Sequence, residues 1–578
     1  MKKLNKLAVL TLDCQATHSN PAIGYLAEIG WVKTQANHTF DHEMTTENVE
    51  SHLVKVGKNV RIPKQFLRMT GIKPEEWKDA LSKKVVWQKL YRMAKRTSSE
   101  NRGICPAVIH FSRYEEPYLK LLHQEFAPNI EFPFTVLCTH EIISRLYPGL
   151  PRKSLRAAAG FLGFSLPNLR RSLHHVVATA FIWNHIVRIL EEQEKIVAFE
   201  ELRDWLRNTP PPTLSKQRAR DYPMEKALLK QLPDEPGIYR MYRSTGDLLY
   251  IGKAKSLKHR VNSYFQKKCR HAEHILEMLS QAQNLSTTVT QTALEAAVRE
   301  SDDIKRQSPP YNRALQPSER QIYFYSKDFK SHQTEPNIQH PVGPFPSNIK
   351  MESLAKLIDV LNGKIRKFSP RLIETILDIL PEHAPEKECF ESGLEAFKKE
   401  YCAHREMPIN VRHVMKWGTQ FWQEKLIEQE LEKEIKEAEE DQEEGWTPER
   451  VFKAQKRIIR MGSFQIRRSR WFCRLSESSI SWSKPNGSEE DKHVLIFEKG
   501  ATNFRYRNPL SGVAGSPPGH KKTLLQRQSY FDIATYDRMR IVTTEMRRII
   551  QEGRNIELKL HPGNTLNKEQ LQKILKWV

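Results

Sequence analysis

The segment from residue 232 to residue 316 constrains the fold of this 578-residue chain more than any other part, and it begins LPDEPGIYRMYRSTGDLLYIGKAKSLKHRVNSYF. Residues 237–243 and 247–251 are two short runs rich in Ile, Tyr and Leu that flank Ser-Thr-Gly-Asp, a pattern that predicts a β-hairpin. Residues 255–266 then place apolar side chains at helical spacing. The apolar stripe of this helix consists of Leu257, Val261 and Phe265.

Basic and phenolic side chains accompany the predicted helix. Arg260 and Tyr264 lie four residues apart, so they share one helix face. Lys253 lies in the strand-to-helix loop, where backbone N–H groups and the helix N-terminus favour a phosphate. The residues expected to contact nucleic acid nearby are Lys255, Lys258 and His259. The alternative is an ordinary hairpin and helix with solvated Lys and Arg side chains.

A second helix, predicted over residues 292–307, carries a carboxylate on its apolar face. The stripe consists of Ala293, Ala297, Glu300 and Ile304. A carboxylate on an apolar face is costly to bury unless it is paired or binds a cation. Three flanking charges are expected to point into solvent, namely Glu295, Arg299 and Asp303. The alternative is that a neighbouring Arg or Lys neutralises Glu300 at a domain edge.

The ordered set of these residues, with Asn312 in the turn PPYN, resembles the GIY-YIG nuclease domain, most of all that of the UvrC and Cho excision-repair nucleases. The resemblance implies that Glu300 is the single protein ligand of Mg²⁺ or Mn²⁺. It also implies that Tyr250 accepts a proton from the attacking water, while Lys253 and Arg260 stabilise charge on the phosphate. The residues expected to orient these groups are Tyr239, Tyr264 and Asn312, although Tyr239 could equally be a core aromatic.

A second resemblance begins near the N-terminus. LAVLTLDCQAT, at residues 7–17, predicts a buried strand that ends in an acid, and GYLAEIGWVK, at residues 24–33, predicts a neighbouring strand. With AVIHFSRYEEPYL at residues 107–119 and RRSLHHVVATAFIW at residues 170–183, these segments resemble the motifs of the DEDDh exonucleases, the DnaQ-like proofreading family. The resemblance implies an RNase H-like fold.

The exonuclease motifs depart from the family pattern at the positions that carry chemistry. These exonucleases use four acids to hold two divalent cations and a histidine to activate water. Asp13 stands in the first acidic position, Gln15 replaces the second acid, and Glu115 stands where an aspartate is usual. Arg170 occupies the usual histidine position and His175 that of the last aspartate. Because amide and imidazole groups are poor ligands for Mg²⁺, a non-catalytic DNA-binding role is favoured over two-metal cleavage and over a rearranged site or softer metal. A further alternative is that His174 and His175 have no role in a site and simply lie on the surface of a helix.

Composition agrees with a polyanion-binding protein. The chain has 92 Lys and Arg against 69 Asp and Glu, a net charge of +23. Residues 216–270 contain fourteen Lys and Arg and five Asp and Glu, which makes this part a local basic patch. Seven cysteines without a CxxC pair indicate reduced thiols in a cytoplasmic protein. No segment reaches the roughly 18 apolar residues of a membrane span.

The length predicts a multidomain α/β and α+β chain. The expected parts are an RNase H-like exonuclease domain at 1–207, a basic linker at 208–231, a small α+β GIY-YIG domain at 232–320, a mainly helical region at 340–462 and a mixed α+β region at 463–578.

Finer patterns are expected within these parts. They are a helical pattern over 173–207 that ends in Asn208-Thr209-Pro210-Pro211-Pro212, one long helix over 420–460 with an acidic run at 439–444, and strands over 464–500 around a turn at Pro485-Asn486-Gly487. The run FQIRRSRWFCR, at residues 464–474, suggests either a surface for nucleic acid or a half-exposed strand.

These observations predict a cytoplasmic, metal-dependent endonuclease that nicks one strand of DNA in nucleotide excision repair, with a DnaQ-like domain that binds or positions the DNA. The expected partners are DNA and excision-repair proteins, with no membrane and no small-molecule cofactor beyond the metal. One alternative is an active 3′ to 5′ exonuclease with an accessory GIY-YIG domain. Another is a non-catalytic DNA-binding scaffold.

Overall fold

The structure is a computed structural model in which the chain divides into two compact units. Unit 1 comprises Met1–Val289 and Pro309–Arg313, and unit 2 comprises Thr290–Ser308 and Ala314–Val578. The structure describes residues 2–578 except 37–45, 58–59, 61, 166–168, 211–219, 267–269, 314, 316–319, 350, 404–407, 436–444, 484–491, 507–522 and 561–562.

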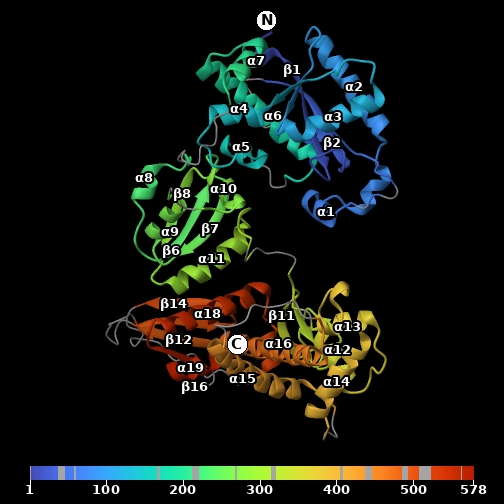
Figure 1. Ribbon diagram of the computed structural model, residues 1–578. Coiled ribbons are helices and arrows are strands. Elements are labelled where there is room, and N and C mark those ends of the chain that lie inside the picture. The colour runs from blue at the N-terminus through green and yellow to red at the C-terminus, as the bar shows by residue number, and fades with distance from the viewer. Residues whose placement is uncertain are drawn as a thin grey trace. The chain divides into compact units, whose positions relative to one another are not determined.

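A five-stranded sheet in the order β3-β2-β1-β4-β5 organises the first part of unit 1 (Figure 1). Its strands are β1 (Ala8–Ala16), β2 (Leu26–Gln35), β3 (Glu50–Leu53), β4 (Pro106–Ile109) and β5 (Thr135–Cys138). β1 pairs antiparallel with β2 and parallel with β4. The two strands predicted from residues 7–17 and 24–33 are therefore confirmed as neighbours.

Helices bury both faces of this sheet. Along β1, Val9 packs into one apolar core and Leu10 and Leu12 into another, because successive side chains of a strand point to opposite faces. The first core includes α6 and the second includes α2 and α3. The helices of this part are α1 (Lys64–Thr70), α2 (Lys83–Glu100), α3 (Ser112–Phe126), α4 (Thr139–Leu146), α5 (Leu155–Phe161), α6 (Ser172–Ile189) and α7 (Phe199–Asn208).

The helical pattern predicted over residues 173–207 corresponds to two helices in the structure. α6 is followed by a π-helical turn over Leu190–Glu194, and Lys195 then adopts a left-handed conformation with φ of 59°. A second helix, α7, starts where the Glu201 side chain accepts hydrogen bonds from the backbone N–H groups of Val197 and Ala198. α7 ends at Asn208, as predicted, whereas Pro211 and Pro212 lie outside the described residues.

The second part of unit 1 contains the predicted hairpin and helix. β6 (Gly237–Tyr242) pairs antiparallel with β7 (Leu248–Ala254), and α9 (Leu257–Tyr264) follows. At the turn, Gly246 has a φ of 86°, which glycine adopts without a steric penalty. A third strand, which is polar and was not predicted from the sequence, pairs with the other edge of β6. The remaining elements are α8 (Lys226–Lys230), α10 (Glu273–Leu279) and β8 (Asn284–Val289).

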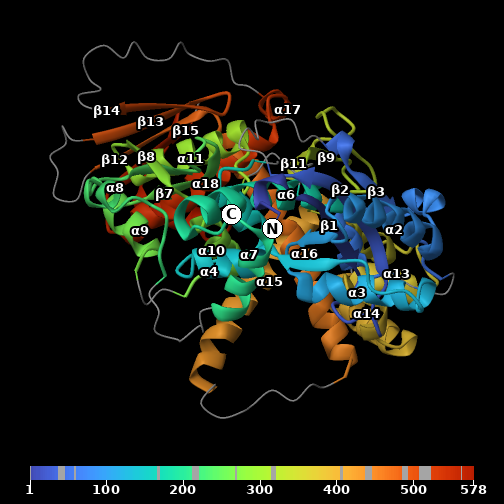
Figure 2. The same ribbon diagram turned by 90° about the horizontal axis from the view of Figure 1, so that it is seen from above.

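A helical subdomain forms one part of unit 2. α14, α15 and α16 pack side by side, and the small sheet β10-β9-β11 adjoins them (Figures 1 and 2). The elements are β9 (Ile322–Tyr325), β10 (His332–Gln333), β11 (Val342–Pro346), α12 (Glu352–Leu361), α13 (Pro370–Leu377), α14 (Lys387–Tyr401), α15 (Val411–Ile435) and α16 (Pro448–Leu475). The single helix predicted over 420–460 is therefore two helices, and the acidic run at 439–444 lies outside the described residues.

α16 also corrects the prediction of strands from residue 464. The helix runs unbroken through residues 462 and 463, where the composition suggested a domain boundary, and ends at Leu475. Trp471 and Phe472 are buried in a core, and the Trp471 Nε1 donates a hydrogen bond to Thr543 Oγ1 at 3.0 Å. These aromatic rings are thus unavailable to nucleic acid. The predicted turn at Pro485-Asn486-Gly487 lies outside the described residues.

An antiparallel sheet in the order β14-β13-β12-β15-β16 completes unit 2 (Figure 2). Its strands are β12 (Ser478–Ser483), β13 (Lys492–Glu498), β14 (Ala501–Tyr506), β15 (Ile556–Leu560) and β16 (Asn564–Leu566). The accompanying helices are α17 (Leu524–Gln528), α18 (Ile533–Gln551) and α19 (Lys568–Leu575). Among the described helices, none combines the length and apolar character needed to cross a membrane.

The helix predicted at 292–307 is α11 (Ala293–Gln307), and it packs against α18 within unit 2. Leu294 and Val298 join the core beneath the five-stranded sheet of this unit. Lys305 lies 3.1 Å from the buried carboxylate of Asp537, which also pairs with Arg320 at 3.1 Å. α11 is therefore anchored to the C-terminal region by apolar packing and by a buried charge cluster.

Candidate functional site

A chain of hydrogen bonds fixes the predicted arginine on α9. Tyr239 is fully buried, and its hydroxyl lies 3.0 Å from that of Tyr264. Arg260 donates to the Tyr264 hydroxyl at 3.1 Å, and its guanidinium lies 4.9 Å from the centre of the Tyr264 ring. Burial, together with the neighbouring phenols, raises the pKa of Tyr239 well above its usual range, so its hydroxyl stays protonated. Tyr239 is thus a core aromatic whose hydroxyl also anchors Tyr264, and Tyr264 in turn orients Arg260.

Close contacts with neighbouring atoms explain the two glycines at positions 237 and 252. A side chain at Gly252 would place its Cβ 2.4 Å from the Tyr239 hydroxyl. A Cβ at Gly237 would lie 2.4 Å from the backbone oxygen of Thr288 on β8. Since carbon atoms do not approach oxygen this closely without displacement, each position admits only glycine as long as its neighbours stay in place.

Asn312 is a buried residue that joins two segments of the chain by hydrogen bonds. Its side chain is buried and pairs with both backbone groups of Ile251 on β7, accepting from the N–H at 2.9 Å and donating to the oxygen at 2.8 Å. This pairing holds residues 309–313 against the strand that carries Tyr250. An orienting role for Asn312 is consistent with this geometry.

The other predicted residues of unit 1 lie on β7 and at the start of α9. Tyr250 and Lys253 are partly exposed on β7, so Lys253 lies within the strand and not in the strand-to-helix loop as predicted. The Tyr250 ring centre lies 6.1 Å from that of Tyr239. The N-terminus of α9 is capped by Ser256, whose hydroxyl accepts from the backbone N–H of His259. The residues predicted to bind nucleic acid are all exposed, namely Lys255, Lys258 and His259.

Glu300 lies on α11 and belongs to unit 2, whereas the other six predicted GIY-YIG residues belong to unit 1. Its side chain is partly buried. Ala297 and Ile304 of the predicted stripe are buried, while Ala293 is partly exposed. A carboxylate oxygen is a ligand that Mg²⁺ accepts, and Mg²⁺ keeps several waters when the protein offers few ligands. Glu300 therefore fits a Mg²⁺ ligand.

Two charges flanking Glu300 are buried, contrary to the prediction that they point into solvent. Glu295 accepts from the backbone N–H of Gln291 at 3.1 Å and pairs with Arg299 at 2.6 Å. Asp303 pairs with Arg306. Burial of these carboxylates is tolerated because each has a hydrogen-bonded or cationic partner. Only Arg299 is exposed, as predicted.

The structure brings the exonuclease-like residues together in unit 1. His175 Nδ1 lies 3.0 Å from Asp13 Oδ1, and Gln15 Nε2 lies 3.4 Å from the same imidazole nitrogen. Glu115 accepts from the backbone N–H of Cys14 at 2.8 Å. Arg170 takes part through its backbone oxygen, which accepts from Gln15 at 3.0 Å. His175 thus faces the site and is not a helix-surface residue.

The donor set of this cluster does not fit a pair of metal ions. Burial, and next the charge of Asp13, raises the pKa of Glu115 well above its usual range. Burial lowers the pKa of His175, but the Asp13 carboxylate more than offsets this and the net pKa is raised. Within the described ranges, no cluster of three His, Cys, Asp or Glu side chains could hold a metal ion. The donor set is therefore too poor in carboxylates for two hard cations.

Restoring the two missing carboxylates should restore metal binding. We expect the double variant Gln15→Glu, His175→Asp to bind Mg²⁺ at least about tenfold more tightly than the parent, since even outer-shell changes alter metal affinity by roughly 10–100-fold. Isothermal titration calorimetry measures this affinity on the full chain carrying Glu300→Gln throughout, so that the proposed GIY-YIG metal site does not contribute, with Gln15→Asn, His175→Asn as the uncharged control. Equal Mg²⁺ affinity in the parent and in the acidic variant would contradict this interpretation.

A buried ion pair that the sequence reasoning missed sets the position of His175. Glu28, near the start of β2, is 1% exposed and pairs with Arg171 at 2.8 Å. Its other oxygen accepts from the backbone N–H of Ser172, the first residue of α6. The pair therefore fixes the start of the helix that carries His175. The available signal was an acid in the otherwise apolar run GYLAEIGWVK.

His110 is a buried titratable group beside this cluster. Its nitrogens lie 2.9 Å from Thr139 Oγ1 and 3.0 Å from the Lys153 backbone oxygen. Burial, and next the charge of His140, lowers the pKa of His110 to about 3.

This shift predicts acid sensitivity of the fold. A histidine whose pKa is lower in the folded state stabilises the fold above its unfolded-state pKa of about 6.5, and the contribution is lost as pH falls towards the folded-state value. Between pH 7 and pH 5, we expect the parent to lose about 2 kcal/mol more free energy of unfolding than His110→Gln. Urea denaturation at both pH values measures the difference. Identical losses in both proteins would count against this account of His110.

Two parts of the chain match known families. Residues 235–313 match the family described as the UvrC-like GIY-YIG domain, and residues 10–175 match the family described as exonuclease. The UvrABC system protein C of Psychrobacter sp. is 40% identical over 114 residues, which are 20% of this chain and 18% of that relative. The chain thus spans less than a fifth of the length of this curated relative.

Solved structures match the same two parts. The GIY-YIG N-terminal endonuclease domain of UvrC from Thermotoga maritima, bound to magnesium as its catalytic cation, is 33% identical, with 15% of this chain and 99% of that chain covered and a TM-score of 0.14. The nuclease domain of 3′hExo, a DEDDh family member bound to rAMP, is 17% identical, with 33% of this chain and 96% of that chain covered and a TM-score of 0.27.

The folds and the family matches together define a chain with two nuclease domains. Both resemblances predicted from the sequence are confirmed. Residues 235–313 are similar to the UvrC-like GIY-YIG domain, and residues 10–175 are similar to the exonuclease family, with acidic positions partly replaced.

Proposed function

We propose that this chain is a metal-dependent endonuclease that nicks one strand of DNA in nucleotide excision repair. The observation that carries the proposal is the chain of hydrogen bonds from Tyr239 through Tyr264 to Arg260, which holds the Arg260 guanidinium beside the GIY-YIG hairpin. A planar guanidinium offers paired donors for phosphoryl oxygens. The exonuclease domain would bind or position DNA, because its residues do not fit the two-metal set.

Each residue of the GIY-YIG set has a distinct role in this proposal. Tyr250 accepts the proton of the attacking water, and Arg260 and Lys253 stabilise the charge that develops on the phosphate. Glu300 would hold Mg²⁺ or Mn²⁺, which supplies positive charge for the same purpose. The positioning residues are Tyr239, Tyr264 and Asn312. Exposed Lys255, Lys258 and His259 would bind the phosphate backbone in a salt-dependent manner.

The partners and the compartment follow from the same reasoning. The matched relatives are named as protein C of the UvrABC system, so we take other excision-repair proteins as the partners of this chain. We place the activity in the cytoplasm, because the cysteines that the structure describes are all free thiols.

One assay tests this function. Parent, Glu300→Gln and Asp13→Ala proteins are incubated with end-labelled damaged and undamaged duplex in Mg²⁺ or Mn²⁺. A damage-dependent internal nick that only Glu300→Gln loses is the expected result. Nucleotide release from the 3′ end that Asp13→Ala loses would instead indicate an active exonuclease. Binding without cleavage by the parent would indicate a scaffold.

A further inference from the structure

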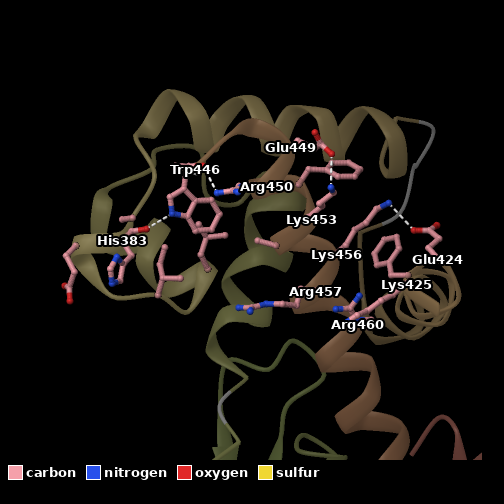
Figure 3. Close-up of a pocket in the computed structure, with 18 residues that line it drawn as sticks. His383, Glu424, Lys425, Trp446, Glu449, Arg450, Lys453, Lys456, Arg457 and Arg460 are labelled. Carbon is pink, nitrogen blue, oxygen red and sulfur yellow. Dashed lines mark hydrogen bonds and ion pairs between the residues drawn. The ribbon is translucent and has the colours of Figure 1, made fainter. Parts of the chain in front are cut away.

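A basic pocket with a volume of about 920 Å³ lies in unit 2, between the end of α13, the described part of α15 and the first turns of α16 (Figure 3). This volume is within the range of about 300–1,000 Å³ that is typical of ligand pockets. None of the residues assigned to the GIY-YIG or exonuclease sites lines it. The pocket is therefore a candidate site for a ligand that neither of the two nuclease-like sites binds.

Cations dominate the wall of the pocket. Three acids line it, and the cations are Lys425, Arg450, Lys453, Lys456, Arg457 and Arg460. Four of these cations, at positions 450, 453, 457 and 460, recur at helical spacing along one face of α16. Such a row of like charges attracts a ligand with several negative charges along its length, as a nucleic-acid backbone has.

Part of this charge is not neutralised within the protein. Lys453 pairs with Glu449 at 2.9 Å and Lys456 with Glu424 at 3.1 Å. Among the residues that the structure describes, Lys425 and Arg457 form no ion pair, and Arg457 is exposed. The pocket thus keeps positive charge for an external anion.

An oriented indole ring supplies a second kind of contact. Trp446 lines the pocket and is partly exposed, and its Nε1 donates to the His383 backbone oxygen at 2.6 Å (Figure 3). This hydrogen bond fixes the ring while leaving part of it at the pocket wall. Lys456 lies 4.8 Å from the ring centre of Phe452, another lining residue. Aromatic rings beside cations are the combination that binds single-stranded nucleic acid.

We propose that this pocket binds an unpaired nucleotide of single-stranded DNA, with Trp446 stacked on the base and the α16 cations on the flanking phosphates. The inference rests on the proposed function only in taking DNA as the substrate. A base can enter a pocket only when it leaves the helical stack, so intact duplex does not fill this site. Stacking accepts any base, and the site therefore recognises strand state and not sequence.

Binding measurements on the full chain test the proposal. EDTA prevents cleavage, and fluorescence anisotropy follows a labelled oligothymidylate of about 15 nucleotides. We expect Trp446→Ala to weaken binding about fivefold or more, and Trp446→Phe to retain most of the affinity. Arg457→Glu should lower the slope of log affinity against log salt by about 0.7. Lys559→Glu, an exposed charge change on β15, is the matched control and should bind like the parent.

Cross-linking shows where the strand lies. An oligonucleotide with iododeoxyuridine should cross-link to the tryptic peptide that contains Trp446, and dTMP alone should compete poorly. Cross-links confined to residues 1–320, or unchanged binding by both Trp446→Ala and Arg457→Glu, would overturn the proposal. So would equal competition by polyglutamate, which would identify an acidic-peptide site. None of these results depends on nicking, so a failure here is distinct from a failure of the Glu300 assay.

Discussion

Glu300→Gln is expected to abolish metal-dependent nicking by this chain. The amide preserves the size of the side chain but removes the negative charge that would hold Mg²⁺ or Mn²⁺. A bound metal contributes several kcal/mol to catalysis of phosphoryl transfer, and each 1.36 kcal/mol is a factor of ten in rate. We therefore expect the initial rate of nicking to fall by at least about 10³-fold. Gel analysis of end-labelled damaged duplex measures this rate.

A matched carboxylate on the same helix provides the control. Asp302 is partly exposed and pairs with Arg538 at 2.9 Å, so Asp302→Asn removes one charge from α11 without touching the proposed ligand. This variant should nick at nearly the parental rate. DNA binding in EDTA should be the same for the parent and Glu300→Gln. If purified Glu300→Gln nicks as fast as the parent, Glu300 is not the metal ligand.

The second large effect is expected from Asp537→Ala. The Asp537 carboxylate is 1% exposed and pairs with Lys305 on α11 and with Arg320, both at 3.1 Å. Burial lowers the pKa of Lys305 despite the presence of Asp537. Removal of one partner from a buried ion pair typically costs about 3–5 kcal/mol, because the other charge is left uncompensated. We expect a loss of this size in the free energy of unfolding.

Chemical denaturation of the full chain, followed by tryptophan fluorescence, measures this loss. Nicking should also slow at temperatures where the parent is stable, because α11 carries Glu300. Arg538→Ala breaks a more exposed pair on the same two helices and removes a hydrogen bond to the Gly500 backbone oxygen, so it should cost about 1–2 kcal/mol. A loss of that smaller size in Asp537→Ala would mean that the charge cluster does not hold α11 in place.

The local pattern of the GIY-YIG segment could be predicted from the sequence, whereas the packing of its last helix could not. β6, β7 and α9 follow the alternation and helical spacing of their own residues. On α11, the sequence showed one apolar stripe, but Glu295, which lies outside that stripe, is also buried. The sequence of a helix reveals a second buried face poorly when polar side chains line it and find partners there.

The misassigned start of the C-terminal region has a similar cause. Over residues 464–474, short apolar and basic alternations fit a strand as well as a helix. The segment is helical because Trp471 and Phe472 on α16 are buried against residues more than 60 positions further along the chain. In the exonuclease part, the substitutions at Gln15 and His175 were visible in the sequence. The hydrogen bond from His175 to Asp13, in contrast, could be found only from the structure, because it depends on how β1 and α6 pack.

Because Leu294 and Val298 pack into the C-terminal core, α11 belongs to the matched nuclease segment by sequence and to unit 2 by packing. A truncated gene product that ends at residue 320 would expose both apolar side chains and would leave Lys305 without Asp537. Loss of the C-terminal half would therefore remove the packing that holds α11, the helix that carries the proposed metal ligand Glu300. Recombination that exchanges residues 321–578 therefore has to preserve the surface that receives α11.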